Sequence, residues 1–286
     1  MNTRALTSRI ETLERIKPPV AVNETWKASA VAFATEALHF DADPWQTDAL
    51  TTLSKRAIWL CSRQTGKSTT AAVIGLHTAI YTPKALVLLV SPSLRQSMEL
   101  YRKVTTFINV MEHPPTLVED TKTSLELTNG SRIVCLPGSE ATVRCYSAVN
   151  LIVEDEAARV SDAFNMATRP MLAVSGGRLI ELSTPFGKRG HFYNTWSKQF
   201  ANWHRINITA DECSRIPKEF LETELLEIGQ WWYAQEYQNV FNDQLDSFFI
   251  SQVIESAFIT GVEPLLGHLS FDEFMRSHSS STPPVR

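Results

Sequence analysis

The stretch Cys61-Ser62-Arg63-Gln64-Thr65-Gly66-Lys67-Ser68 decides the fold class of this chain. It follows a short apolar segment, Ala57–Leu60, and leads into a segment with helical spacing of its apolar residues. Strand, loop and helix in this order are the context that a phosphate-binding loop requires. Gly66 lets the backbone approach phosphate groups, and the first amide groups of the helix face their negative charge. The motif predicts that Lys67 neutralises β- and γ-phosphates and that Ser68 completes a Mg²⁺ shell.

Short apolar segments alternate with helical patterns on both sides of this loop. Strands are predicted at Ala57–Leu60, Ala85–Val90, Leu151–Glu154, Arg178–Leu182 and His204–Ile208, and helices at Lys67–Ile80, Arg95–Val110, Asp162–Val174 and His191–Phe200. Such alternation is typical of a mostly parallel sheet with helices on both faces, so we expect an α/β fold. Asn129-Gly130, between Ser124–Leu127 and Arg132–Leu136, is a strong turn signal and predicts an inserted β-hairpin.

The two ends of the chain read as helical. Leu6, Ile10, Leu13 and Ile16 are spaced for a first helix, and a second pattern runs from Trp26 to Leu38. After Pro217 we expect helices over Lys218–Ile228 and Trp231–Phe241. The Ser- and Pro-rich stretch Ser277–Arg286 predicts a disordered tail.

A second chemical signal is the apolar run before Asp155-Glu156. A strand that ends in two carboxylates fits a Walker B element, with Asp155 holding Mg²⁺ through water and Glu156 orienting and deprotonating the attacking water. We expect the two side chains to point in opposite directions, as consecutive strand residues do. Alone, the pair could equally be an acidic cap on the next helix. Glu154 has no assigned role and is expected where the strand reaches the surface.

The strand at Arg178–Leu182 is followed by Ser183-Thr184-Pro185-Phe186-Gly187. Small hydroxyl residues at this strand end would lie beside the γ-phosphate, where Ser183 and Thr184 could sense hydrolysis. An ordinary turn from strand to loop accounts for the same residues if the other motifs are ignored.

Several motifs occur together in one order. They are Pro44-Trp45-Gln46, the loop Ser62–Ser68, Val143-Arg144-Cys145-Tyr146-Ser147 before Ile152–Ala158, Ser183–Tyr193, and Trp232-Tyr233-Ala234-Gln235-Glu236-Tyr237. Over about residues 40–250 this combination resembles the ATPase domain of phage terminase large subunits, the motors that package viral DNA. The resemblance implies a P-loop ATPase core of the additional-strand, RecA-like class that binds ATP and Mg²⁺.

The resemblance also implies roles for single residues. Gln46 would read the adenine edge, with Trp45 either beside the base or anchored in the core. Arg63 would face the phosphates, and Arg144 would act as an arginine finger on a neighbouring subunit. Together with Asp155, Ser183 and Thr184, the expected nucleotide contacts are Ser62, Arg63, Gln64, Thr65, Gly66, Lys67, Ser68 and Thr69. Cys61 and Cys145 stand where the family usually has glycine.

From the resemblance we expect three regions: a helical extension or lid over residues 1–43, the ATPase domain over 44–250, and a linker with tail over 251–286. Its implied partners are double-stranded DNA, a homo-oligomeric ring on a portal protein, and a small terminase subunit. We expect no nuclease site, because no apolar strand after Phe249 carries an aspartate. A superfamily 2 helicase-like ATPase and a degenerate nucleotide-binding scaffold remain the alternatives.

Composition is consistent with this interpretation. Of 286 residues, 43% are hydrophobic and 20% are charged, which allows a sizeable core. The formal net charge of −4 limits any DNA contact to a local basic patch. The four cysteines show no metal-site spacing, and no apolar run has the length of a leader or a membrane span. We therefore expect no structural metal, no membrane contact and a location in the host-cell cytoplasm.

Overall fold

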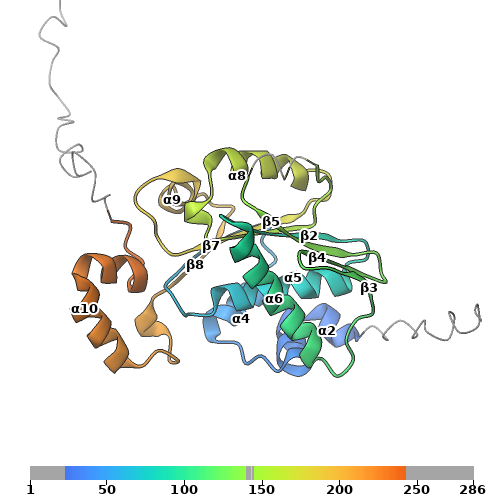
Figure 1. The fold of residues 1–286 in the computed structure, drawn as a ribbon, viewed down its shortest axis with the longest axis horizontal. Helices are drawn as coiled ribbons and strands as arrows, with labels where there is room; N and C mark the ends of the chain where they lie inside the picture. The colour runs from blue at the N-terminus through green and yellow to red at the C-terminus, as the bar shows by residue number, and fades with distance from the viewer. Residues whose placement is uncertain (1–22, 140–142, 144, 243–286) are drawn as a thin grey trace, which may run out of the picture. The chain divides into compact units, whose positions relative to one another are not determined.

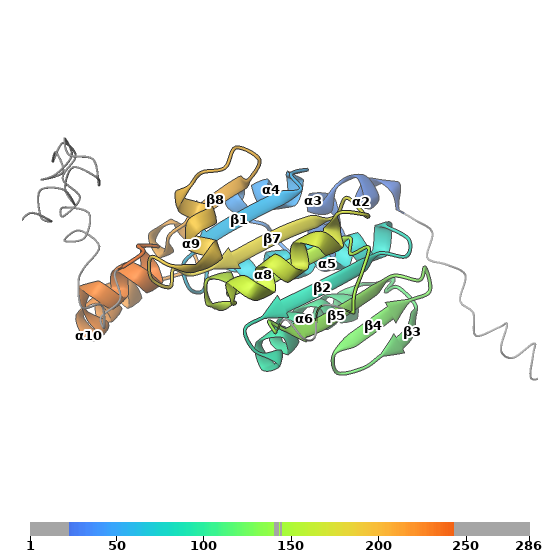
Figure 2. The same cartoon turned by 90° about the horizontal axis from the view of Figure 1, so that it is seen from above.

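The computed structural model describes residues 23–139, 143 and 145–242. Within these residues an eight-stranded sheet has the order β3-β4-β5-β2-β6-β7-β1-β8 (Figure 2). The strands are β1 Arg56–Cys61, β2 Leu86–Ser91, β3 Leu117–Asp120, β4 Ser124–Leu127, β5 Arg132–Pro137, β6 Leu151–Asp155, β7 Arg178–Ser183 and β8 His204–Ile208. Read across the sheet in this order, every neighbouring pair between β5 and β8 is parallel, whereas β4 pairs antiparallel with both β3 and β5.

This topology confirms the predicted α/β fold, the five parallel strands and the hairpin at Asn129-Gly130. Strand β3 was not predicted. It is an edge strand, and Val118 is 65% exposed, so its sequence carries no buried apolar run. Tyr101, in the helix Leu94–Val110, holds the end of this strand by donating its hydroxyl to Asp120 Oδ1 at 3.0 Å.

The helical elements mostly follow the predicted segments. They are α2 Glu24–Ala28, α3 Ala30–Ala32, the π-helix η1 Phe33–Ala37, α4 Pro44–Thr51, α5 Lys67–Tyr81, α6 Leu94–Val110, α8 Asp162–Thr168, α9 Gly190–Ser197 and α10 Lys218–Tyr237, with 3₁₀ turns η2 Ala157–Arg159, η3 Arg169–Leu172 and η4 Ala210–Glu212. The predicted helix at residues 1–22 and the tail at 243–286 lie outside the described residues.

Three helix predictions need correction. The segment Trp26–Leu38 is not one helix, because Ser29 is extended (φ −138°, ψ 109°) and caps the next turn by accepting from Ala32 N–H. The helix from Asp162 ends at Thr168 and tightens into a 3₁₀ turn that contains Pro170, a residue that cannot continue an α-helix. In α10 the chain breaks at Gly229 (φ 76°), between the two predicted helices, and the second part ends at Tyr237.

Helices cover both faces of the sheet, and strand residues alternate between them (Figure 1). Helices α4, α5 and α6 pack on one face against side chains such as Trp59, Leu89 and Val153. Helix α8 packs on the other face, against Leu88 and Ile152. The sequence motifs at the ends of β1, β6 and β7 therefore each contribute alternate side chains to opposite faces. No helix in the described ranges is long and apolar enough to cross a membrane.

Candidate active site

The loop between β1 and α5 has the backbone of a phosphate-binding loop. Gly66 has φ +92°, a conformation that disfavours any side chain, and a Cβ added there would lie 2.7 Å from Gln46 Nε2 and force the Gln46 amide to shift. Thr65 is fully buried and donates its hydroxyl to the Ser62 carbonyl at 3.0 Å, which closes the loop. The first amide groups of α5 follow directly at Lys67. The predicted loop is confirmed as a strand–loop–helix element.

The departure at Cys61 has a simple structural reason. Cys61 is the last residue of β1 and lies in the core between the sheet and α5, with no exposed surface. Burial raises the pKa of its thiol to about 12, so Cys61 stays neutral. It acts as a small apolar residue that ends the strand, and the loop geometry does not require glycine at this position.

Lys67 lies at the centre of the site and is paired with Glu156. Its Nζ is 3.2 Å from Glu156 Oε1, and the residue is 8% exposed. Burial alone would lower the pKa of Lys67, but the charges of Glu156 and Asp155 outweigh it and raise the pKa. The lysine is therefore a fixed cation at the start of α5.

Ser68 and Asp155 lie side by side next to this pair. The Ser68 hydroxyl donates to Asp155 Oδ2 at 2.8 Å, which brings two hard oxygen ligands together. Burial, helped by the charge of Glu156, raises the pKa of Asp155 to about 6. A divalent cation would relieve this cost of burying a carboxylate, so Ser68 and Asp155 fit the Mg²⁺ position that the sequence predicted.

Glu156 does not point away from Asp155, contrary to our expectation. Its backbone is left-handed (φ 54°, ψ 41°), an uncommon conformation for glutamate. The turn ends the strand alternation, and the Glu156 amide donates to Asp155 Oδ1 at 3.0 Å. Both carboxylates consequently reach residues at the start of α5: Asp155 contacts Ser68, and Glu156 contacts Lys67.

Arg159 is a site residue that the sequence analysis missed. Its Nη1 donates to Glu156 Oε2 at 3.0 Å and to Thr184 Oγ1 at 3.1 Å, and its guanidinium stacks over the Phe186 ring at 4.5 Å. One arginine thus joins the Asp-Glu motif of β6 to the Ser-Thr motif of β7. The i, i+3 spacing of Glu156 and Arg159 was a visible signal, but the contact with Thr184 was not.

Arg63 is held on the outer side of the loop. Its Nε donates to Glu236 on α10, and its backbone N–H donates to the Glu236 carbonyl at 3.1 Å. The other Glu236 oxygen lies 3.8 Å from Arg159 Nη2. The Arg63 side chain remains 60% exposed. Glu236, in the motif Trp232–Tyr237 that carries part of the resemblance, therefore connects α10 to two arginines of the site.

These residues surround a cavity of about 540 Å³. Its lining consists of Arg63, Gln64, Gly66, Lys67, Ser68, Thr69, Gln96, Lys103, Glu156 and Arg159. Thr69 Oγ1 accepts from Lys103 Nζ at 3.2 Å, which draws a fourth cationic group to the rim. The lining holds four basic side chains and one carboxylate, which suits a polyanion such as a nucleoside triphosphate.

Gln46, the residue expected to read the adenine edge, lies against the loop beside Gly66. It is fully buried, and its Oε1 accepts from the Asp43 amide at 2.8 Å. Its Nε2 has no hydrogen-bond partner among the described residues and lies beside Gly66. Trp45 packs edge-to-face on Trp59, with ring centroids 6.2 Å apart, which favours the core-anchor alternative.

The remaining predicted residues fall into two groups. Ser62 and Ser183 are fully buried, and their hydroxyl groups have no hydrogen-bond partner among the described residues. Arg144, the expected finger, lies outside the described residues. Arg215 was not predicted, yet its guanidinium donates to the Thr65 carbonyl at 2.8 Å and to Asp43 at 2.7 Å, bridging the loop and the start of α4.

Comparison with known proteins places this site in a family. Residues 58–250 match the family model for the N-terminal part of the T4-like virus type of terminase large subunit. The large terminase ATPase domain of Thermus phage P74-26 is similar in fold, with a TM-score of 0.63 and 18% identity over 72% of this chain and 96% of that one. The HK97 bacteriophage large terminase gives 0.56 and 15% over 82% of this chain and 52% of its own.

The large terminase of a thermophilic bacteriophage, solved in complex with ATP-γ-S, gives a TM-score of 0.52 and 14% identity over 74% of this chain and 51% of that one. This chain thus spans about half the length of complete large terminases and nearly all of an isolated ATPase domain. The family match covers every motif from β1 to α10. The chain belongs to the family of terminase large subunit N-terminal domains of the T4-like virus type.

Proposed function

We propose that this chain is the ATP-hydrolysing motor domain of a viral DNA-packaging terminase large subunit, coupling ATP hydrolysis to movement of double-stranded DNA into a procapsid. One observation carries the proposal. Lys67, the Ser68–Asp155 pair and Glu156 converge on a single basic cavity at the carboxyl ends of β1 and β6. Open parallel sheets bind ligands at this edge.

The chemistry divides among the residues as follows. The loop amides and Lys67 bind the phosphates, and the free Nε2 of Gln46 is a donor for the adenine edge. When bound, Mg²⁺ held by Ser68 and Asp155 supplies charge neutralisation at the β- and γ-phosphates. Glu156 orients a water and takes its proton as the oxygen attacks the γ-phosphorus.

Arg159 and Arg63 contribute positive charge on the open side of the cavity. Arg159 fixes Glu156 relative to Thr184, so hydrolysis at one strand end is communicated to the next. We propose Arg144 as the group that a neighbouring subunit supplies to the transition state. This assembly role implies a homo-oligomeric ring, and we propose that the ring acts on a portal protein together with a small terminase subunit.

A phosphate-release assay with and without Mg²⁺ tests the proposal directly. We expect Mg²⁺-dependent ATP turnover by the wild type, and loss of binding of a fluorescent ATP analogue in Lys67→Ala. Lys122→Ala, in an exposed turn beside β4, is the matched control and should bind normally. Unchanged nucleotide affinity in Lys67→Ala would refute the phosphate-loop assignment. No turnover by the wild type, alone or with double-stranded DNA, would refute the ATPase function.

A further inference from the structure

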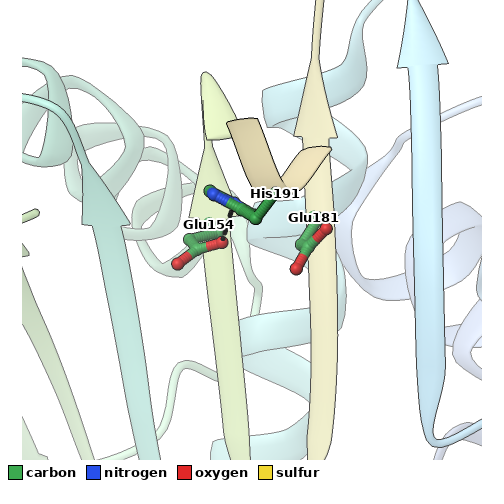
Figure 3. Close-up of side chains that lie close together, drawn as sticks. All are labelled: Glu154, Glu181 and His191. Carbon is green, nitrogen blue, oxygen red and sulfur yellow. Dashed lines mark hydrogen bonds and ion pairs between the residues drawn. The ribbon is translucent and has the colours of Figure 1, made fainter. Parts of the chain in front are cut away.

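A second cluster of ionisable residues lies on the opposite face of the same strands. Glu154 of β6 and Glu181 of β7 are partners in the parallel register, and both are fully buried. Figure 3 shows them on neighbouring strands, with His191 of α9 beside them. Glu154 therefore does not lie where the strand surfaces, and our expectation for this residue was wrong. One ligand-type atom from each of the three residues lies within 4.8 Å of the others.

The cluster is connected by hydrogen bonds. His191 Nε2 lies 3.2 Å from Glu154 Oε2, and the His191 amide donates to Asp162 Oδ1 at 2.6 Å. Asn165 Nδ2 donates to Glu154 Oε2 at 3.1 Å and to Glu181 Oε1 at 2.8 Å. Two adjacent buried carboxyl groups repel each other when both are ionised, and these hydrogen bonds stabilise the pair.

The donor set decides between a metal site and a hydrogen-bond network. Arg169 Nε donates to Asn165 Oδ1 at 3.0 Å, which fixes the amide so that its nitrogen faces the carboxylates. The Asn165 nitrogen thus occupies the position between Glu154 and Glu181 that a shared cation would need. Its N–H groups already satisfy one oxygen of each carboxylate. The geometry favours the network.

The network is placed to act on the hydrolytic residues. Glu154 immediately precedes Asp155-Glu156, and Glu181 lies three residues before Thr184. His191 lies in the first turn of α9, the helix that follows the loop carrying Thr184 and Phe186. The loop that contacts Arg159 is therefore held at both of its ends, because His191 contacts Glu154 directly and Glu181 is joined to Glu154 through Asn165.

We propose that Glu154, Glu181 and His191 are positioning residues for hydrolysis. From the opposite face of the sheet they hold Glu156 and the Thr184 loop at the distance from each other that lets Arg159 contact both. The inference rests on the proposed ATPase function. A loss of this link misplaces the attacking water and leaves the phosphate-binding loop intact. It therefore lowers kcat without changing nucleotide affinity.

The test compares His191→Leu with His191→Gln, because glutamine can place an N–H donor near the position of Nε2. We expect kcat to fall about 10-fold to 100-fold in His191→Leu, with the dissociation constant of a fluorescent ADP analogue within two-fold of wild type. His191→Gln should recover most of the rate. His204→Leu is the control, since His204 pairs with a carboxylate, Asp48, at 3.2 Å but touches neither Glu156 nor Thr184.

Each remaining outcome is informative. A normal kcat in His191→Leu overturns the inference while leaving the ATPase proposal standing. A parallel loss of nucleotide binding, or the same loss in His191→Gln, shows a merely structural role and also overturns it. Elemental analysis supplies a further check. If the wild type holds a stoichiometric transition metal that His191→Leu lacks, the cluster is a metal site and the inferred hydrogen-bond network is wrong. Absence of wild-type turnover is a separate result that refutes the proposed function itself.

Discussion

Glu156 Oε1 lies 3.2 Å from Lys67 Nζ, so the proposed general base and the phosphate-binding lysine are each other's ion-pair partners. Both side chains are largely buried. The same carboxylate accepts from Arg159 through its other oxygen at 3.0 Å. On the proposed function, a γ-phosphate competes with Glu156 for these two cations, because Lys67, Arg159 and Glu156 line one cavity. Nucleotide binding would then loosen the Lys67–Glu156 pair and free the carboxylate for a water.

The Glu156→Gln substitution tests this competition. The amide cannot take a proton from water, so turnover should stop. Removal of the negative charge should also strengthen nucleotide binding about five-fold, since a partly buried pair that opposes binding is worth about 1 kcal/mol. Titration with a fluorescent ATP analogue and a phosphate-release assay measure the two effects. Weaker binding would show that Glu156 supports Lys67 and does not compete with the phosphate.

The contact between Arg159 and Thr184 predicts a coupled catalytic defect. Arg159→Ala should lower kcat about 100-fold, with a smaller change in nucleotide affinity, because Glu156 loses its orienting partner. Arg159→Lys should rescue little, because an ammonium lacks the planar fork that serves Glu156 and Thr184 together. Single-turnover hydrolysis is the measurement, and Arg102→Ala on the exposed face of α6 is the control.

Thr184→Val tests the same contact by removing the hydroxyl that Arg159 donates to. If Arg159 and Thr184 act as a unit, the double variant should be no slower than Arg159→Ala alone. Additive losses would separate the two residues and remove Arg159 as the link between β6 and β7.

Gly66→Ala should abolish nucleotide binding. A left-handed backbone costs a non-glycine residue about 1–2 kcal/mol, and the new Cβ would also collide with Gln46 Nε2. Gly176→Ala is a matched control: its φ is +60°, but no atom lies within 4 Å of the added carbon. Gly176→Ala should lower stability only by the cost of the left-handed backbone, and it should retain nucleotide binding. Equal behaviour of the two variants, read by nucleotide titration and thermal unfolding, would show that space beside Gln46 is irrelevant.

The buried pair behind the sheet predicts a pH-dependent stability. Burial, followed by the charge of Glu154, raises the pKa of Glu181 from 4.5 to about 7. The folded protein therefore keeps a proton there that the unfolded chain releases. The stability that this group contributes is complete below pH 4.5 and is lost as the pH rises through about 7. Burial alone would lower the pKa of His191, but Glu154, Glu181 and Asp162 outweigh it and raise the pKa, which favours the cationic form beside these carboxyl groups.

Glu181→Gln is permanently neutral and should remove this loss. We expect its gain in free energy of unfolding over wild type to be larger at pH 8 than at pH 5, with a difference of at most about 3 kcal/mol. Urea unfolding at both values measures it. Glu227→Gln, on the exposed side of α10, should show no such difference. The same gain at pH 5 and pH 8 would mean that Glu181 is ionised in the folded protein throughout.

The motifs that are continuous in sequence were predictable, and the contacts between them were not. The loop Ser62–Ser68 and the pair Asp155-Glu156 each encode their own backbone, so their elements and their convergence followed from the rule for parallel sheets. Arg159, Thr184 and Glu236 meet only because β6, β7 and α10 pack at one sheet edge. No pattern within one segment of the sequence indicates this contact, so Arg159 was not predicted as a site residue.

Glu154 was misread for a different reason. A charged residue in an apolar strand usually marks a surface position, and Glu154 was interpreted in this way. The sequence held a second charge of the same kind, Glu181, in the neighbouring apolar strand. Considered as a pair, they point to a shared buried network, but the partner strands and the histidine that completes it become evident only from the register of the sheet.

The last prediction concerns Arg144, for which the resemblance to packaging motors suggests a role across a subunit boundary. An isolated subunit then has every group for binding but lacks one for the transition state, and an arginine finger is worth about 10³–10⁵ in rate. Turnover should rise more steeply than linearly with protein concentration, and Arg144→Ala should remove that rise with little change in nucleotide affinity.

A mixing experiment separates this role from one within the same chain. Glu156→Gln has an inactive site but an intact Arg144, whereas Arg144→Ala has an intact site and no finger. Combined, the two variants should recover part of the wild-type rate, since one subunit can serve the other. If mixing restores nothing under conditions where the wild type assembles, Arg144 does not act in trans. Arg159, which already contacts Glu156, would then be the stronger candidate for the catalytic arginine, ahead of Arg63, whose guanidinium is engaged by Glu236.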